Sequence, residues 1–450
     1  MKNSLLVLAC ILVAIISVVL VPFPDGVVAV FLVVMLSLFS IFMFRRATDE
    51  KEFVTSVFLI ALVLRMSFGL LVHVFELRDF FGGDADLYHG NGVGMADVWL
   101  GHSKMTEYLA YQNTHGSGAG WGMNYFVAII YLLVGPNMFA AQSICAVIGA
   151  ATAPMVFFCS KKIFNNVSVS KMSAIAIAVF PSFVIWSGQL LKDGLVVFLL
   201  VLAMTMVLQI QVKWGYGSFV LLIFSLFGIL SLRFYIFYMV MVAVVGSFLV
   251  GMSSSTRSIL RTTIVLALIG ASLGVLGVGE KADVDLRTFG NLERVQVTRL
   301  DLSRAGTGFA ENADVSRGGG ALSVIPIGFA YLMFAPFPWQ ATNLRQAITI
   351  PEVLVWWAML PLLVIGLNYT IRNRLRNAFP ILIFSLLLTL AYSISQGNVG
   401  TAYRQRTQIQ VFLFILIGVG WTVFKEKRES KKILQAAARK RIVERVRAGV

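Results

Sequence analysis

The sequence predicts an all-α, polytopic integral membrane protein with about 12 transmembrane helices and both termini in the cytoplasm. Hydrophobic residues make up 58% of the 450 residues, charged residues only 13%, and the mean hydropathy is +0.83. Apolar stretches of roughly 20 residues, long enough to cross a bilayer, recur from one end of the chain to the other. The basic residues between these stretches follow a pattern that assigns them to one side of the membrane.

The apolar stretches give the expected spans in chain order. They cover approximately residues 4–22, 26–44, 53–75, 137–158, 171–188, 193–212, 216–231, 234–252, 259–277, 351–369, 378–395 and 408–424. Two further apolar segments, 121–135 and 321–339, are not counted as spans. The first is short for a span and the second contains three prolines, which interrupt helices. We expect both to form juxtamembrane helices that lie along the outer membrane face or dip into it.

The basic clusters support this count, because with both segments left out they all fall on one side. The clusters are residues 45–51, 160–162, 256–261, 372–376 and the tail 425–450, which holds ten Lys or Arg and three Glu. Basic residues mark the cytoplasmic side, so the loops 76–136, 278–350 and 396–407 are expected outside. The net charge of +15 therefore favours a lipid-facing tail, and no nucleic-acid partner is expected.

The densest cluster of acid groups occurs in residues 81–90, FGGDADLYHG, directly after the third apolar stretch. Asp84 and Asp86 are two residues apart, and Tyr88 and His89 follow them. Carboxylates would repel an anionic donor, so we predict that they act on an acceptor, as a general base or as a group that orients a hydroxyl. Tyr88 and His89 are candidates for substrate binding.

Basic side chains are also expected at external helix mouths, against the usual charge bias. Several of them together suit a phosphate or pyrophosphate, for which arginine offers forked donors. The candidates for substrate binding are Lys192, Arg233, Arg404 and Arg406, with Asp193 beside Lys192 and Arg65 inside the third span. Simpler explanations stay open for two of them. The helix dipole alone favours an acid at Asp193, and an interhelical ion pair or snorkelling would account for Arg65.

These motifs resemble those of the polyprenol-phosphate-dependent membrane glycosyltransferases, the C superfamily, especially the protein mannosyltransferase and aminoarabinose transferase branch. Members carry a motif Asp-Glu-x-x-Tyr in the first external loop, and DADLY at residues 84–88 matches it except that alanine replaces the glutamate. Pro181 and the pair at 192–193 are similar to a proline and an Arg-x-Asp motif of the family. Residues 404–406 resemble its late arginine-rich loop. The likeness covers about residues 53–240 and is looser elsewhere.

The resemblance implies an inverting glycosyltransferase that moves a sugar from a polyprenyl-phosphate-linked donor to a lipid, glycan or protein acceptor. It gives Asp84 the place of the catalytic carboxylate, and the shift of the second acid to Asp86 leaves open which of the two is the base. It implies no certain cofactor, with a divalent cation possible. The expected location is the inner membrane of a bacterium or archaeon, with the site facing the periplasm or exterior.

The same resemblance divides the chain into five parts. They are two additional N-terminal helices (1–52), a catalytic transmembrane module (53–277), an external loop with a juxtamembrane segment (278–350), C-terminal helices (351–424) and a basic cytoplasmic tail (425–450).

Two other functions stay open. An O-antigen-type polymerase or ligase acting on a polyprenyl-pyrophosphate glycan would also be polytopic, with a large external loop and arginines that bind pyrophosphate. A lipid-linked oligosaccharide flippase or other transporter would have a comparable number of spans. Transporters, however, place polar sites near the midplane on broken helices, whereas here the polar residues are expected at the outer rim.

Overall fold

The computed structural model describes residues 2–81, 83–115, 120–251, 256–278, 291–304 and 306–447. Within these ranges every regular element is a helix, which confirms the all-α class. The helices are α1 (Lys2–Leu20), α2 (Asp25–Arg46), α3 (Lys51–Val74), α4 (Arg78–Phe81), α5 (Asp84–Leu100), α6 (Met105–His115), α7 (Trp121–Val134), α8 (Met138–Phe164), α9 (Val167–Val179), α10 (Pro181–Ser187), α11 (Lys192–Val212), α12 (Tyr216–Leu232), α13 (Phe234–Gly251), α14 (Thr256–Val275), α16 (Leu292–Ser303), α17 (Gly318–Phe334), a short 3₁₀ helix (Pro338–Gln340), α18 (Leu344–Ser395) and α19 (Val399–Arg447).

Seven of the described helices are long and apolar enough to cross a membrane, and the bent pair α9–α10 would make an eighth. Twelve spans are therefore not confirmed. Three other expected spans, near 4–22, 216–231 and 259–277, correspond to α1, α12 and α14, whose apolar parts within the described residues are Ser4–Leu20, Tyr216–Leu232 and Thr262–Val275. The expected spans 351–369 and 378–395 are both part of α18. This helix is 52 residues long and is divided at Arg374, which has non-helical backbone angles. The chain is a helical membrane protein, with seven or eight candidate spans among the described residues.

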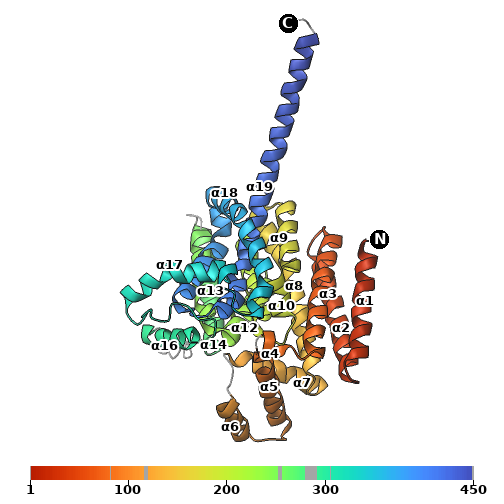
Figure 1. The fold of residues 1–450 in the computed structure, drawn as a ribbon, viewed down its shortest axis with the longest axis vertical. Helices are drawn as coiled ribbons and strands as arrows, with labels where there is room; N and C mark the ends of the chain where they lie inside the picture. The colour runs from red at the N-terminus through yellow and green to blue at the C-terminus, as the bar shows by residue number, and fades with distance from the viewer. Residues whose placement is uncertain are drawn as a thin grey trace.

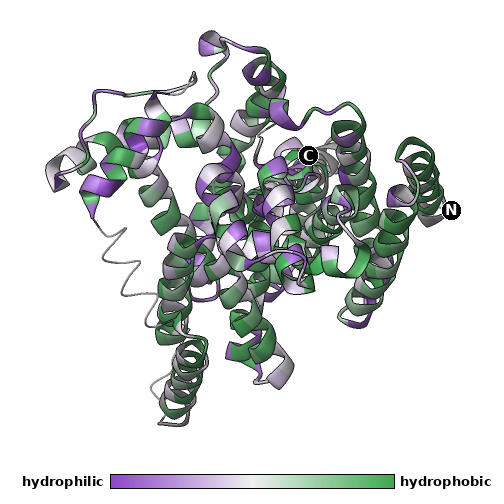
Figure 2. Cartoon of the chain, turned by 90° about the horizontal axis from the view of Figure 1, so that it is seen from below, coloured by the Kyte–Doolittle hydropathy of each residue, from purple (hydrophilic) through white to green (hydrophobic). Residues whose placement is uncertain are grey.

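The helices form a bundle from which the end of α19 projects (Figure 1). The helices α4 to α6 lie toward the opposite end of the bundle, with α7 beside them. The helix α19 continues straight beyond the bundle, so the basic tail is helical as far as Arg447. Helices near the N-terminus are hydrophobic over most of their surface, whereas hydrophilic residues gather toward the middle of the bundle (Figure 2). A functional site is therefore expected in this polar interior.

The two segments that the sequence excluded as spans are both helices. Residues 121–135 form α7, of 14 residues, and residues 321–339 contain most of α17, of 17 residues. Both fall short of the length of a full span, and α7 lies with α4 to α6 at one end of the bundle (Figure 1). Of the expected basic cluster at 256–261, the side chains other than Leu260 lie outside the described residues, as do residues 279–290 of the large loop.

The helices α18 and α19 cross at a pair of glycines. A Cβ atom on Gly420 would lie 1.9 Å from the carbonyl oxygen of Leu362, and one on Gly366 would lie 1.9 Å from the carbonyl oxygen of Leu416. Small residues let membrane helices approach this closely, so that backbone packs against backbone. Because α19 carries Arg404, this crossing also fixes the position of a site residue.

We expect Gly420→Ala to lower the stability of the protein by about 1–3 kcal/mol, because backbone atoms must shift to admit the methyl group. The measurement is thermal unfolding of the detergent-solubilised protein. Gly270→Ala in α14 is the matched control, since no atom lies within 4 Å of a Cβ placed there. Equal unfolding temperatures for the two variants would contradict the close crossing.

Candidate functional site

Four segments that are distant in sequence bring charged side chains to one place. Asp84 is the first residue of α5, Asp193 lies in the first turn of α11, Arg233 connects α12 to α13, and Arg404 lies near the start of α19. Both acids therefore occupy helix N-termini, where the helix dipole favours negative charge. Gly83 precedes Asp84 with a φ of 55°, a left-handed conformation that glycine adopts without strain, and this turn starts α5.

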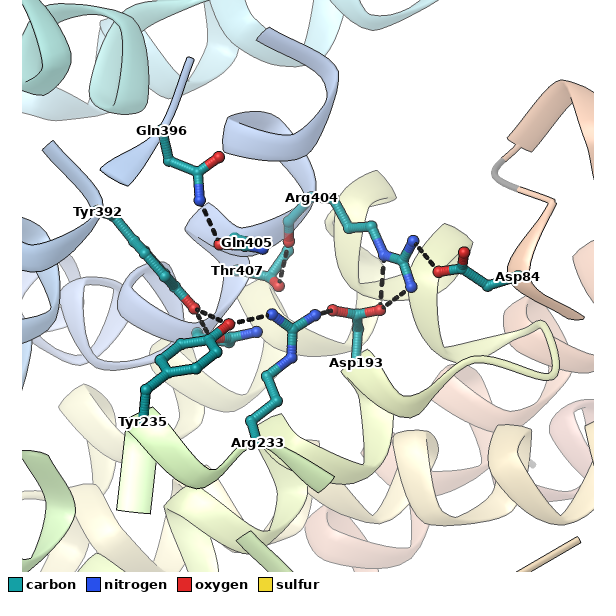
Figure 3. Close-up of polar contacts among 10 residues, drawn as sticks. Asp84, Asp193, Arg233, Tyr235, Tyr392, Gln396, Arg404, Gln405 and Thr407 are labelled. Atoms are coloured by element: carbon teal, nitrogen blue, oxygen red, sulfur yellow. Dashed lines mark hydrogen bonds and ion pairs between the residues drawn. The ribbon is translucent and has the colours of Figure 1, made fainter. Parts of the chain in front are cut away.

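Arg404 joins the two acids (Figure 3). Its Nη1 donates to Oδ2 of Asp84 at 2.7 Å, and its Nε donates to Oδ2 of Asp193 at 2.6 Å. The other carboxylate oxygen of Asp193 accepts from Nη2 of Arg233, also at 2.6 Å. Asp193 has no exposed surface, whereas the side chain of Asp84 is 41% exposed. The network thus runs from a buried carboxylate to one that solvent can reach.

Two tyrosines extend this network on the side away from Asp84. Nη1 of Arg233 donates to the hydroxyl of Tyr235 at 2.6 Å, and the Tyr235 and Tyr392 hydroxyls are 3.4 Å apart. Tyr392 in turn donates to the Gln408 side chain at 2.7 Å. Apart from the Arg233–Tyr235 contact, which lies within the α12–α13 junction, each step joins a different pair of helices, so the arginines are held from several directions and keep their orientation.

A large cavity of about 1590 Å³ opens beside the network. Asp84, Lys192, Arg233 and Arg404 all line it, and they are joined by apolar and aromatic side chains that include Phe80, Trp186, Leu232, Phe234 and Met239. A pocket with a few charged groups set in an apolar wall is the usual form of a binding site. The volume exceeds the range of about 300–1,000 Å³ that is typical for small-molecule pockets.

The structure brings five of the predicted residues together: Asp84, Lys192, Asp193, Arg233 and Arg404. The prediction for Asp193 needs a correction, because both of its oxygens are engaged by arginines and it does not line the cavity. Asp193 orients the arginines that do. Lys192 lies with Nζ 6.0 Å from the centre of the Tyr88 ring.

Among the described residues of the 81–90 segment, Phe81 and Asp84 line the cavity, whereas Asp86, Tyr88 and His89 do not. Asp86 pairs with Arg78 at 3.1 Å, and its side chain is 52% exposed. Burial raises the pKa of the Tyr88 hydroxyl well above its ordinary value, so it stays protonated and cannot act as a base. Burial lowers the pKa of His89, which shares a hydrogen bond of 2.6 Å with the Tyr131 hydroxyl. Of the two aspartates, only Asp84 faces the cavity.

Arg65 has a different role from the one that the sequence suggested. It is buried away from the cavity, and its guanidinium donates to the carbonyl oxygens of Ile177 and Ala178, each at 3.1 Å. These carbonyls belong to the last turn of α9, where Pro181 lacks the N–H that would continue the helix. Arg65 supplies the missing donors at this break, which explains why a charge is retained there.

Arg406 does the same for another helix end. It is fully buried, and its Nη1 donates to the carbonyl oxygens of Met333 and Ala335 at 3.1 and 2.9 Å. These carbonyls end α17, directly before Pro336. Arg406 is therefore not among the residues that line the cavity, although it is two positions from Arg404. The predicted substrate-binding roles of Arg65 and Arg406 are replaced by structural ones.

The acids do not fit a shared divalent cation. Asp84 and Asp86 pair with different arginines, Arg404 and Arg78. Among the described residues there is no group of three or more His, Cys, Asp or Glu side chains that could hold a metal ion. A cation would have to displace both arginines, so we assign no step to a metal.

Comparisons with known proteins add no family assignment. No family model matches the chain. Searches of curated proteins and of solved structures likewise found no match. The likeness to glycosyltransferases thus rests on the residues quoted above. Sequence reasoning missed Tyr235, Tyr392 and Trp186, because the first lies in an aromatic stretch and the other two lie in apolar runs that carry no polar signal.

Proposed function

We propose that this protein is a glycosyltransferase that moves a sugar from a polyprenyl-phosphate donor to a lipid, glycan or protein acceptor. The proposal includes the outer face of a bacterial or archaeal inner membrane as the place of reaction. One observation carries it: a carboxylate and five basic side chains line the same large, largely apolar cavity, and three of the five, Lys192, Arg233 and Arg404, lie with Asp84 at helix ends. An amphipathic donor needs both parts, a charged site for its phosphate and an apolar wall for its lipid.

The basic groups are suited to the donor phosphate. Lys192, Arg233 and Arg404 outnumber the one carboxylate that lines the cavity, so the potential there favours an anion. Arg404 is the key residue, because its Nη1 is held by Asp84. A phosphate that binds Arg404 competes with Asp84 for this donor, and it releases the carboxylate next to the place where the acceptor arrives.

The released Asp84 is then the general base. The acceptor hydroxyl gives its proton to the Asp84 carboxylate while the hydroxyl oxygen forms a bond to the anomeric carbon. The bond from that carbon to the phosphate oxygen breaks, and its electron pair leaves with the polyprenyl phosphate. Lys192 and the two arginines stabilise the charge on this leaving group. Attack from the opposite face inverts the anomeric configuration.

A second candidate, a polymerase or ligase that uses a polyprenyl-pyrophosphate glycan, is favoured by one observation. Both aspartates of the network are neutralised by arginines, and three basic groups would match the larger charge of a pyrophosphate. A flippase or other transporter fits less well, because the charged residues that line the cavity lie at the ends of helices.

Mass spectrometry of cells that lack the gene separates these functions. If the protein transfers a sugar, a polyprenyl-linked donor accumulates and one sugar is missing from the surface glycan, lipid or protein. A polyprenyl-phosphate monosaccharide supports the first proposal, and a polyprenyl-pyrophosphate oligosaccharide supports the second. Complementation with the intact gene is the control. Unchanged glycans and no accumulated donor would contradict both.

A further inference from the structure

A second buried acid lies directly behind the site. Glu352 on α18 is 6% exposed, and its Oε2 accepts a hydrogen bond of 2.6 Å from the hydroxyl of Tyr403 on α19. Its Oε1 accepts from the hydroxyl of Ser182 on α10. Three helices therefore meet at one carboxyl group. Neither the sequence motifs nor the mechanism above uses this residue.

Two opposing influences act on the charge of Glu352. Burial disfavours the charged carboxylate. Within the described part of the chain, no Lys, Arg or His forms an ion pair with Glu352 that would offset this cost. Arg406 is the charged group whose field reaches it. The Arg406 guanidinium lies 5.1 Å from the centre of the Tyr403 ring, and this positive charge favours the carboxylate. The hydrogen bonds from Ser182 and Tyr403 also favour the carboxylate, so burial opposes three groups, and a further negative charge nearby would add to the effect of burial.

The hydrogen-bond partners suit either form. Both are hydroxyls, which donate or accept as required, and the Ser182 and Tyr403 oxygens are themselves 3.0 Å apart. A carboxylate accepts a hydrogen bond from each hydroxyl. A protonated carboxyl group instead donates one hydrogen bond to a hydroxyl oxygen. The two hydroxyl groups then rotate so that each still donates to a neighbouring oxygen. No heavy atom has to move when the proton arrives or leaves.

Glu352 is also connected to the cavity through one residue. Tyr403 lines the cavity and precedes Arg404 in α19. Trp186 contacts both residues, with its ring 6.2 Å from that of Tyr403 and 5.6 Å from the Arg404 guanidinium. An anion that binds at Arg404 thus adds negative charge next to Tyr403, the hydrogen-bond partner of Glu352, and this favours the protonated carboxyl group.

We propose that Glu352, with Tyr403 and Ser182, is a proton-binding site, and that binding of an isoprenoid phosphate at Arg404 is coupled to uptake of a proton there. This inference rests on the proposed function for the identity of the anion. Glu352 acts through Tyr403 and touches no substrate, so it is a positioning residue. The affinity for the phosphate then falls as pH rises, by at most about tenfold per pH unit, until Glu352 is ionised in both states.

The test is proton uptake by the full-length protein in lipid nanodiscs when farnesyl phosphate is added in weakly buffered solution with a pH indicator. We expect uptake of up to one proton per bound molecule, and none with uncharged farnesol. Glu352→Gln is expected to bind farnesyl phosphate without proton uptake. Glu107→Gln, at an exposed position on α6, is the matched control and should behave as the unmodified protein.

Uptake that persists in Glu352→Gln, or binding by the unmodified protein without uptake, would overturn the inference. Absence of farnesyl phosphate binding would instead contradict the proposed function. Infrared difference spectra recorded without ligand at several pH values then measure the protonation of Glu352. The carbonyl stretch of a protonated carboxyl group should be lost in Glu352→Gln and its pH midpoint should shift in Tyr403→Phe. If neither variant changes the spectrum, Glu352 does not titrate.

Discussion

Replacing Asp84 with asparagine is expected to lower the rate of sugar transfer by about 10²–10⁴-fold, the contribution that a general base typically makes. Asparagine keeps the size of the side chain and its oxygen, so it still reaches Arg404 but cannot take a proton. Because the Asp84 side chain is 41% exposed, the fold should be little affected. The measurement is transfer from a polyprenyl-phosphate sugar in membranes that contain equal amounts of each variant.

Asp86→Asn is the matched control for this experiment. Asp86 is two residues away and also pairs with an arginine, but it does not line the cavity. We expect Asp86→Asn to retain most of the activity. The reverse result, with activity lost in Asp86→Asn and kept in Asp84→Asn, would move the role of base to Asp86. Full activity in both variants, together with loss in Arg404→Gln, would favour the polymerase or ligase.

The largest effect on stability is expected from Asp193→Asn, at roughly 3–5 kcal/mol, the cost of breaking a buried ion pair by removal of one partner. Asp193 has no exposed surface and lies between the guanidiniums of Arg233 and Arg404. Without its charge these two cations face each other in the interior, where water cannot screen them. Thermal unfolding of the detergent-solubilised protein measures this loss.

Asp97→Asn, on the partly exposed face of α5, is the control and should unfold at nearly the same temperature as the unmodified protein. Combining Asp193→Asn with Arg233→Met removes one of the two cations and should recover part of the stability. It should not recover transfer, because Arg233 lines the cavity. If Asp193→Asn is as stable as Asp97→Asn, the carboxylate does not hold the arginines together.

The sequence predicted which residues carry charge at helix ends, but not which of them meet. Asp84, Lys192, Arg233 and Arg404 were all identified from their positions beside apolar stretches, and all four line one cavity. Arg406, at the outer edge of the last span, and Arg65, inside the third span, were also predicted to bind substrate, yet they donate to carbonyl oxygens at helix ends. From a single sequence, an arginine that binds a ligand and one that completes a helix end look alike, because both are polar residues within an apolar run.

The two structural arginines share one feature: each donates to carbonyl oxygens at a helix end that is followed by a proline. The carbonyls that Arg65 reaches precede Pro181, and those that Arg406 reaches precede Pro336. Both prolines were visible in the sequence. Their partners were not, because the contacts span 112 residues for Arg65 and Ile177, and 71 for Arg406 and Ala335.

The sequence by itself determined that this is an all-helical membrane protein, because the length and hydropathy of apolar stretches are local properties that the bilayer selects. It also placed the candidate acids and bases at helix ends. Only the tertiary structure decided that Asp84 and Asp193 share Arg404, contacts that join positions 320 and 211 residues apart. Such pairing depends on how helices pack in three dimensions, and no local pattern of charge or hydropathy encodes it.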